Sequence, residues 1–198
     1  MMLKIDANDT DAVERTARVL LSGGVAALPT ETVYGLATLW SNEEGRARIY
    51  ALKHRPANKL LQMLAASLDD AETAGLQRGP RLDAVARRFC PGPITIVAPA
   101  NDGASIGVRI PNHSFLLKLL KKLGQPLAAT SANLSGMREA LNAADAVQWL
   151  DGEPDVLVDG GEIQGGAAST VVSLLGEQPT ILRKGPITLE DMLAVDIK

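Results

Sequence analysis

Helix-spaced apolar positions are the first pattern along the chain. The stretch 114–123 repeats apolar residues every three or four positions and places lysines between them, as in a helix that packs on a core. The same spacing, with stop and capping residues, predicts helices at 11–22, 42–52, 80–88 and 143–150. We expect Asp9 or Thr10 to cap the first of these, and Thr188 to cap a last helix near the C-terminal end.

Short apolar runs bounded by turn residues predict strands between the helices. The run 94–97 (ITIV) is the clearest, because it is β-branched and follows the turn sequence Pro91-Gly92-Pro93. Several connections between such runs are too short for a parallel crossover. We therefore expect an α/β fold, a single domain over 1–198 with a twisted mixed parallel and antiparallel sheet and flanking helices. The expected strands are 25–28, 60–66, 94–97, 105–110, 127–129, 156–158, 170–174 and 180–183.

Composition places the chain among globular proteins. Its 198 residues are 46% hydrophobic and 22% charged, which is enough apolar surface for one core. The net charge of -3 and a pI near 5.4 argue against a protein whose whole surface grips nucleic acid. Aromatic residues, at 3%, are too few for a repeated base-stacking platform. A local basic cleft is compatible with these numbers.

Cysteine and histidine usage excludes two further classes. Cys90 is the only cysteine, so the sequence has neither an internal disulfide nor a thiolate metal cluster, and we interpret this residue as packing rather than as a nucleophile. His54 and His113 lack the spacing of metal ligands. The N-terminal residues have no signal-peptide layout, and no apolar run reaches membrane-spanning length. We expect a cytoplasmic protein that has no membrane partner.

Common catalytic motifs are absent from the sequence. It contains no P-loop, no G-x-G-x-x-G after the first strand and no G-x-S-x-G. Arginines and lysines at the ends of elements remain, together with loops of small hydroxyl residues. These residue types suit phosphate oxygens and a small polar substrate.

The stretch 53–59 (KHRPANK) concentrates cations where a predicted helix ends. Pro56 prevents an ordinary helix from continuing, so Lys53, Arg55 and Lys59 are expected to project from the helix end or the next loop. By itself such a run is typical of a solvated helix end stabilised by the macrodipole. Binding of an anion is the alternative interpretation, and it requires other residues to complete the site.

Seven short segments follow one another in a recognisable order. They are 29–36 (PTETVYGL), 53–56 (KHRP), 91–95 (PGPIT), 107–111 (GVRIP), 130–136 (TSANLSG), 169–172 (STVV) and 182–183 (LR). In order and spacing they resemble the YrdC-like domain of threonylcarbamoyl-AMP synthases, from about Val25 to Pro186. The resemblance implies the YrdC-like fold and covers nearly the whole chain.

The resemblance implies an enzyme that condenses L-threonine, bicarbonate or CO2, and ATP. The products would be threonylcarbamoyl-adenylate and pyrophosphate, for the t6A modification of tRNA. Charge would gather on the transferred phosphorus, so preplaced cations and the Mg2+ carried by the ATP phosphates would supply much of the catalysis. The protein itself is expected to supply no metal ligand. The expected partners are the proteins that next transfer the threonylcarbamoyl group, and weak binding of tRNA is compatible with this role.

The same resemblance implies roles for individual residues. Lys53 and Arg55 would hold the phosphates during catalysis, with Lys59 close by, and Arg109 would pair with the threonine carboxylate. The remaining implied contacts are Ser105, Asn133 and Arg183 for ATP, and Thr32, Ser131 and Ser169 for threonine, with Ser131 and Asn133 together positioning the nucleotide and the threonyl group.

Structural interpretations stand beside these roles. Thr32 and Thr95 suit strands, and for Thr95 we prefer that interpretation, while Ser131 and Asn133 suit a plain turn. Arg109 is harder to assign to a purely structural role, because a charge within an apolar strand needs a partner. We interpret Glu31 as a structural partner for a cation or a backbone amide. The glycines of 160–166 suit a phosphate nest or a turn equally.

The chain departs from the family pattern at four places. Many members carry Asn where Lys59 stands and a histidine where Leu64 stands, so a threonine contact by that histidine is not expected here. Ser173 stands where an Asp often closes the 169–172 segment, and an extra C-terminal domain of longer members is not expected beyond Lys198. The alternative function is a module that binds tRNA or double-stranded RNA on the same cationic surface. A third possible function is that of a paralogue that keeps the fold and uses another carbamoyl-type substrate.

Overall fold

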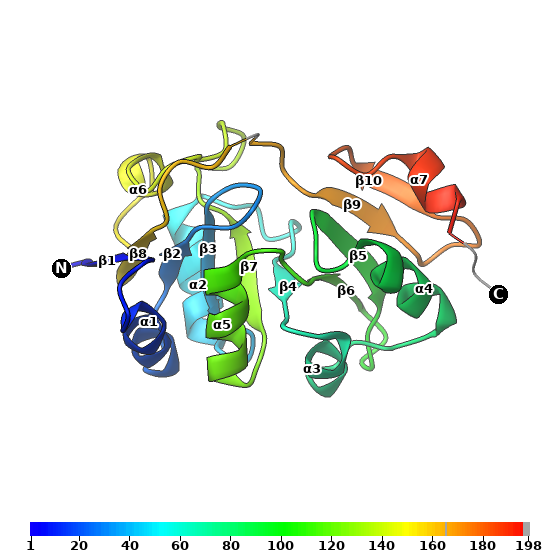
Figure 1. Cartoon of the computed structure of the whole chain (residues 1–198), viewed down its shortest axis with the longest axis horizontal. Coiled ribbons are helices and arrows are strands. Elements are labelled where there is room, and N and C mark those ends of the chain that lie inside the picture. The colour runs from blue at the N-terminus through cyan, green and yellow to red at the C-terminus, as the bar shows by residue number, and fades with distance from the viewer. Residues whose placement is uncertain (165, 196–198) are drawn as a thin grey trace.

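The computed structural model describes residues 1–164 and 166–195, whose strands form one ten-stranded sheet (Figure 1). The strands are β1 (Leu3–Asp6), β2 (Ala26–Leu28), β3 (Gly35–Leu39), β4 (Gln62–Leu64), β5 (Ile94–Pro99), β6 (Ser105–Arg109), β7 (Leu127–Ser131), β8 (Val156–Asp159), β9 (Thr170–Ser173) and β10 (Thr180–Arg183). The helices are α1 (Ala12–Leu21), α2 (Glu43–Leu52), α3 (Leu68–Thr73), α4 (Pro80–Phe89), α5 (Ser114–Leu123), α6 (Asp145–Gln148) and α7 (Leu189–Leu193).

Strand order and direction confirm the predicted mixed sheet. The order is β1-β8-β2-β3-β7-β4-β6-β5-β9-β10. Four neighbouring pairs are parallel, namely β1 with β8, β2 with β8, β4 with β6 and β5 with β9. The other five pairs are antiparallel. The fold class expected from the sequence is therefore confirmed.

The predicted helices are present, with corrections at their ends. Thr188 caps α7, where its hydroxyl accepts from the Asp191 amide at 3.1 Å. The predicted cap of α1 is wrong, because the helix begins after Asp11 and the Asp11 side chain makes no capping bond. The helix predicted at 143–150 is reduced to α6, a single turn.

Three elements were not predicted, and each lacks a strong local signal. In β1 only Ile5 is buried, so the strand has almost no apolar pattern. β3 begins at Gly35, a residue that is uncommon in strands. α3 is six residues long and is too short to show a helical repeat. Conversely, the strand predicted at 60–66 is reduced to β4, and Leu60 is exposed.

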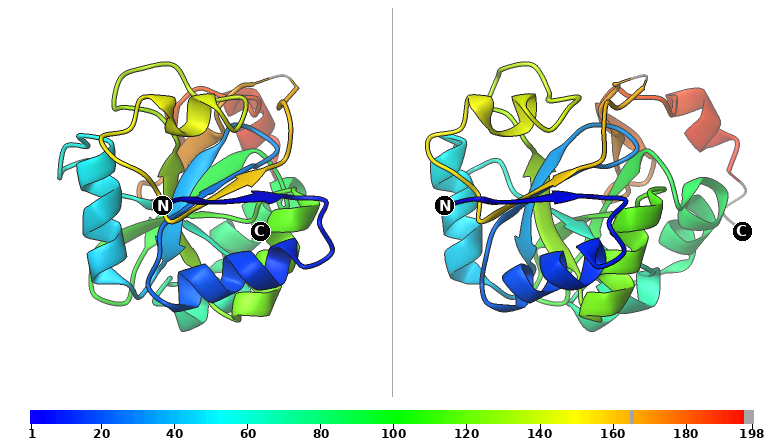
Figure 2. Two further views of the ribbon diagram at one scale, coloured as in Figure 1. Left: turned by 90° about the vertical axis from the view of Figure 1, so that its left-hand side faces the viewer. Right: turned by 60° about the vertical axis from the view of Figure 1, so that its left-hand side comes forward.

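The half of the sheet formed by β1, β8, β2, β3 and β7 is covered by helices on both faces. α1 and α5 pack on one face, where Leu20 and Leu119 are fully buried with strand residues such as Leu28. α2 and α6 cover the other face through Ile49 and Ala146. Figure 2 shows the helices of the two layers on opposite sides of these strands. These strands accordingly carry apolar residues on both faces.

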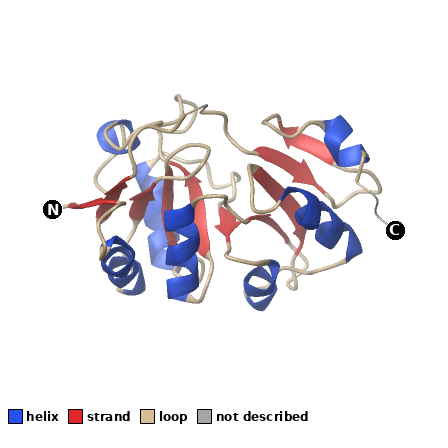
Figure 3. Ribbon diagram, viewed as in Figure 1, coloured by secondary structure: helices blue, strands red, loops and turns tan. Residues whose placement is uncertain are grey.

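The half formed by β6, β5, β9 and β10 is covered differently. Ile94, Ile96 and Val108 point into a core under α4, which lies in front of β5 and β6 in Figure 3. The intervening residues, such as Thr95 and Gly107, line a cavity on the opposite face. Successive side chains of a strand alternate between faces, so one set of strands forms both a core and a cavity wall.

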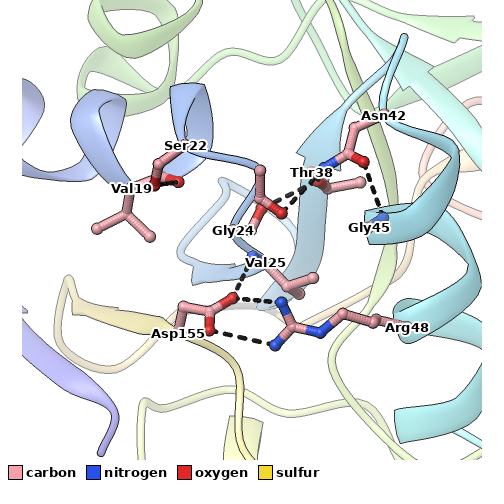
Figure 4. Close-up of polar contacts among 10 residues, drawn as sticks. Val19, Ser22, Gly24, Val25, Thr38, Asn42, Gly45, Arg48 and Asp155 are labelled. Carbon is pink, nitrogen blue, oxygen red and sulfur yellow. Dashed lines mark hydrogen bonds and ion pairs between the residues drawn. The ribbon is translucent and has the colours of Figure 1, made fainter.

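Polar contacts at the N-cap and in the second turn of α2 fix the helix to this framework (Figure 4). Asn42 caps the helix by accepting from the Gly45 amide at 3.0 Å, and its amide group donates to the Gly23 carbonyl at 2.9 Å. Farther along, Arg48 donates twice to Asp155, at 2.8 and 3.2 Å, and Asp155 also accepts from the Val25 amide at 2.7 Å. The position of α2 determines where the cationic stretch 53–59 begins.

Candidate active site

The candidate site is a cavity of about 340 Å3 on the uncovered face of the sheet. Thr95 and Val97 from β5, Gly107 from β6 and Gln62 from β4 form its floor. Its rim includes Leu60 from the loop that follows α2, together with residues 129–131 of β7 and residues 182–183 of β10. The cavity is therefore built from segments far apart in the sequence.

Six of the ten predicted site residues line this one cavity. They are Arg55, Ser105, Arg109, Ser131, Ser169 and Arg183. Three of the six are arginines that arrive from different elements, which concentrates positive charge in a small volume. The roles implied for them at ATP and threonine stay predictions, but the structure brings these side chains together.

Lys53, Lys59, Thr32 and Asn133 do not line the cavity. Lys59 is exposed, and its contact with Arg55 is made by its backbone carbonyl, which accepts from Arg55 Nε at 2.7 Å. Thr32 is buried behind Arg109, from whose Nη2 its hydroxyl accepts at 2.8 Å. Their implied ligand contacts stay predictions that this conformation does not favour.

The expectation that the cations of 53–59 project outward is wrong for Lys53. This side chain is 1% exposed, and its ammonium donates to the backbone carbonyls of Ser131 and Asn133. The Asn133 side chain in turn donates to the carbonyls of Leu134 and Met137, at 2.9 and 2.8 Å. Lys53 therefore ties the end of α2 to the loop that follows β7. Burial lowers the pKa of Lys53 to about 7, and the nearby charge of Arg55 adds to this shift.

Arg55 behaves as expected for a residue at the edge of a site. It is half-buried, lines the cavity and donates through Nη2 to the Leu60 carbonyl at 2.8 Å. Desolvation by burial lowers its pKa from the usual value. His54 points away from the cavity, with Nε2 at 2.7 Å from Asp151. Among the residues of this stretch, Arg55 alone presents its side chain to the cavity.

Arg109 is held by the loop after β2. Its Nη2 lies 2.9 Å from Glu31 Oε1 and donates to Thr32. This confirms the interpretation of Glu31 as the structural partner of a cation. Arg109 is 3% exposed, and within residues 1–164 and 166–195 its Nη1 makes no hydrogen bond to protein. A guanidinium that is fixed at one nitrogen and free at another is suited to bind a carboxylate from the cavity.

A chain of side-chain hydrogen bonds crosses the cavity wall and includes two residues that the sequence did not assign to the site. Arg183 Nη2 donates to Ser169 Oγ at 2.9 Å, Ser169 Oγ lies 3.0 Å from Thr95 Oγ1, and Thr95 donates to Gln62 Oε1 at 2.7 Å. Thr95 does lie in a strand, as preferred from the sequence, but it also lines the cavity. The polar Gln62 inside a run predicted to be apolar was the available signal.

Other sequence features have structural explanations. Burial raises the pKa of the Cys90 thiol to about 11, which is consistent with packing rather than nucleophilic chemistry. In the glycine run, the Gly160 amide donates to the Tyr34 hydroxyl and the Gly161 amide donates to Asp159, both at 2.9 Å, so these amides are already used. Gly165 lies outside the described residues. Within the described ranges no cluster of three His, Cys, Asp or Glu side chains could hold a metal ion.

Comparison with known proteins agrees with this geometry. The family model Sua5_yciO_yrdC, described as telomere recombination, matches residues 18–185. The chain belongs to the Sua5/YciO/YrdC family. The match covers every element that contributes to the cavity, from the loop after β2 to β10. The family resemblance read from the sequence is confirmed.

Relatives within the family are named threonylcarbamoyl-AMP synthase. One from Pyrococcus abyssi is 34% identical over 185 residues, covering 89% of this chain and 54% of that protein. One from Bacillus subtilis is 33% identical over 202 residues, covering 97% of this chain and 58% of the relative. The crystal structure of P. abyssi Sua5 complexed with L-threonine superposes with a TM-score of 0.90 at 31% identity, over 99% of this chain and 61% of that one. The chain thus spans little more than half the length of these relatives.

None of the helices in the described part of the chain is long and apolar enough to cross a membrane.

Proposed function

We propose that this chain is a threonylcarbamoyl-AMP synthase, which condenses L-threonine, bicarbonate or CO2, and ATP to threonylcarbamoyl-adenylate and pyrophosphate. The observation that carries the proposal is the convergence of Arg55, Arg109 and Arg183 with the hydroxyls of Ser131 and Ser169 in one cavity. Relatives that are about a third identical carry this name, and the related Sua5 is seen with L-threonine.

The proposed reaction requires the cavity to bind several anionic groups together. The amine of threonine adds to CO2 and loses a proton to form a carbamate. A carbamate oxygen then attacks the α-phosphorus of ATP as the bond to pyrophosphate breaks. Magnesium enters as part of the ATP substrate and neutralises charge on the phosphates. Holding all reactants in one site shortens the time over which the labile carbamate must survive.

The arginines divide naturally between the substrates. Arg109 is held through Nη2 by Glu31 and Thr32, and its Nη1, which has no hydrogen bond to the described residues, would bind the threonine carboxylate. Arg55 and Arg183 enter from the loop after α2 and from β10, and they suit the phosphates. Fixed cations aimed at charge that develops during reaction are an efficient source of catalysis, because they need no reorganisation. Ser131 lines the same cavity at the end of β7.

The direct test is pyrophosphate release by the purified chain with magnesium and ATP. We expect pyrophosphate only when L-threonine and bicarbonate are both present. Equal release without threonine, or no release under any of these conditions, would contradict the proposal. The adenylate product can be identified by mass spectrometry of the same reaction, which separates synthesis from simple ATP hydrolysis.

The proposed product also indicates its partners. A threonylcarbamoyl-adenylate is a mixed anhydride that water can hydrolyse. A second activity must therefore transfer its acyl group to tRNA before hydrolysis occurs. We therefore propose that the partners of this chain are the proteins that carry out this transfer, as the following step of the reaction sequence. Nucleic-acid binding as the main function is not favoured, since the named relatives are synthases. Steep weakening of tRNA binding between low and physiological salt would mark any residual contact with the phosphate backbone.

A further inference from the structure

The hydrogen-bond chain from Arg183 to Gln62 has a fixed direction. A guanidinium only donates, so Ser169 Oγ accepts from Arg183 and keeps its own proton to donate. Thr95 donates to the Gln62 carbonyl oxygen, so it must accept the proton of Ser169. Each hydroxyl then accepts one hydrogen bond and donates one. The reverse direction would leave the Ser169 proton without an acceptor, although this residue is only 1% exposed.

This direction determines the orientation of the Gln62 amide. Because Gln62 Oε1 accepts from Thr95, its Nε2 is the end that points away from the chain of hydroxyls. Within residues 1–164 and 166–195, Nε2 has no protein hydrogen-bond partner, and it is not among the unpartnered atoms that are fully buried. Gln62 is half-buried and lines the cavity. It therefore offers an unused N–H donor to a ligand there.

The surrounding strands leave space for that ligand beside Arg109. β4 and β6 pair in parallel with Leu64 opposite Arg109, which places Gln62 near Gly107, two positions before Arg109 on the same face. Two strand residues span roughly 7 Å along the backbone, so Gln62 and Arg109 reach the cavity from neighbouring positions on one face. Gly107 has no side chain to fill the space between them, and a Cβ there would approach Thr95 Cγ2 at 3.3 Å.

We infer that Gln62 determines specificity for the amino-acid substrate by donating from Nε2 to its side-chain hydroxyl while Arg109 binds the carboxylate. Thr95, Ser169 and Arg183 act through Gln62 by holding its amide in this orientation. The inference rests on the proposed function, because it takes L-threonine as the occupant. Leu64, two residues farther along β4, is 3% exposed in the core and cannot take this role.

The test compares L-threonine with L-2-aminobutyrate, which has the same carbon skeleton without the hydroxyl. In the Gln62→Met variant we expect kcat/KM for L-threonine to fall about tenfold, the usual cost of losing one hydrogen bond to substrate. The value for L-2-aminobutyrate should not fall, and KM for ATP should not change. Gln77→Met, whose residue lies outside this cavity, is the matched control and should behave as the parent protein.

A second pair of variants tests the orientation by the hydroxyl chain. Thr95→Val removes the hydroxyl at nearly constant size and should lower selectivity for threonine about threefold, whereas Thr95→Ser keeps the hydroxyl and should retain selectivity. Adding Thr95→Val to Gln62→Met should cost nothing further, because both changes break the same contact. Additive losses in the double variant would overturn the orienting role.

Binding without turnover provides a separate measurement. The increase in Tm that L-threonine produces in the parent protein should shrink in Gln62→Met, and the increase from L-2-aminobutyrate should stay the same. Unchanged selectivity between the two amino acids in Gln62→Met would overturn the inference even if the parent makes pyrophosphate. If the parent shows no threonine-dependent pyrophosphate release, the proposed function fails instead.

Discussion

The two halves of the sheet use the same kind of strand for different purposes. In the half from β1 to β7 both faces are covered, so Ala26 and Leu28 join one core while Val25 and Ala27 join another. In the half from β6 to β10 one face is covered and the other forms the cavity. The double-covered half therefore supplies most of the burial, and the single-covered half supplies the site.

This difference separates stability from ligand binding in space. Apolar burial stabilises a fold in rough proportion to the area removed from water, so a face left open as a cavity gives up part of that stabilisation. The remaining strands can tolerate this because they continue a sheet that is already buried on both sides. Substitutions in the two halves should consequently affect different measurements, and four predictions test that separation.

The largest effect is expected for Leu116→Ala in α5. Leu116 is fully buried in the double-covered half, and deleting such a side chain costs about 2–5 kcal/mol of unfolding free energy. KM for threonine should be unchanged at temperatures where the variant is folded. Urea unfolding measures the loss of unfolding free energy. The matched control is Leu182→Ala in β10, where the leucine is 60% exposed and the loss should stay below about 0.5 kcal/mol. Similar losses in both variants would contradict the division.

The next effect is a pH dependence at the boundary between the halves, where Lys53 meets the loop after β7. Its pKa is about 7 in the folded protein against 10.5 for an ordinary lysine, so folding above pH 7 releases a proton. Stability should therefore rise with pH from 7 toward 10, by up to about 1.4 kcal/mol per pH unit. The Lys53→Met variant should lack this rise. Parallel pH profiles for the two proteins in urea unfolding would show that Lys53 stays protonated.

Arg55→Ala should affect activity rather than stability. Removing a preorganised cation from the cavity should lower kcat/KM for ATP at least tenfold, which corresponds to about 1.4 kcal/mol. The unfolding free energy should change little, because the side chain is only half-buried. Arg87→Ala in α4, outside this cavity, is the control. Full activity in Arg55→Ala would show that the phosphate role is wrong.

The smallest effect is expected for Gly107→Ala on the cavity floor. The added Cβ would lie 3.3 Å from Thr95 Cγ2, so the neighbouring side chain must shift by a few tenths of an ångström. We expect a rise of about threefold in KM for threonine, which is less than 1 kcal/mol, with no loss of stability. Steady-state kinetics and thermal unfolding of one preparation measure both. A large loss of stability with unchanged KM would show that Gly107 is needed for packing of the sheet and not for substrate binding.

Much of the fold was predictable because its signals are local. The amphipathic repeat of α5 and the β-branched run of β5 are visible in any window of the sequence. The six cavity residues were predicted through the family resemblance, which transfers positions without explaining their geometry. β1 and β3 were missed because their strand structure comes from neighbours supplied by distant segments.

The errors at the site also arise from contacts between distant segments. Lys53 can be buried because backbone carbonyls 78 and 80 positions away accept hydrogen bonds from its ammonium group, and no local sequence pattern indicates such a contact. Gln62 was overlooked because its value depends on Thr95 and on Ser169, which comes from a third segment. Local periodicity predicts which face a residue occupies, but the partners that meet it there follow from the strand order.

Because β5 and β6 alternate between core and cavity, their sequence contains two sets of positions that evolution can change separately. Residues 95, 97, 105, 107 and 109 line the cavity, while 94, 96, 106 and 108 face the core. A library randomised only at the first set would sample new substrate preferences on an intact scaffold. A single inserted residue in either strand would exchange the two sets, so we expect natural descendants to vary here by substitution and not by insertion.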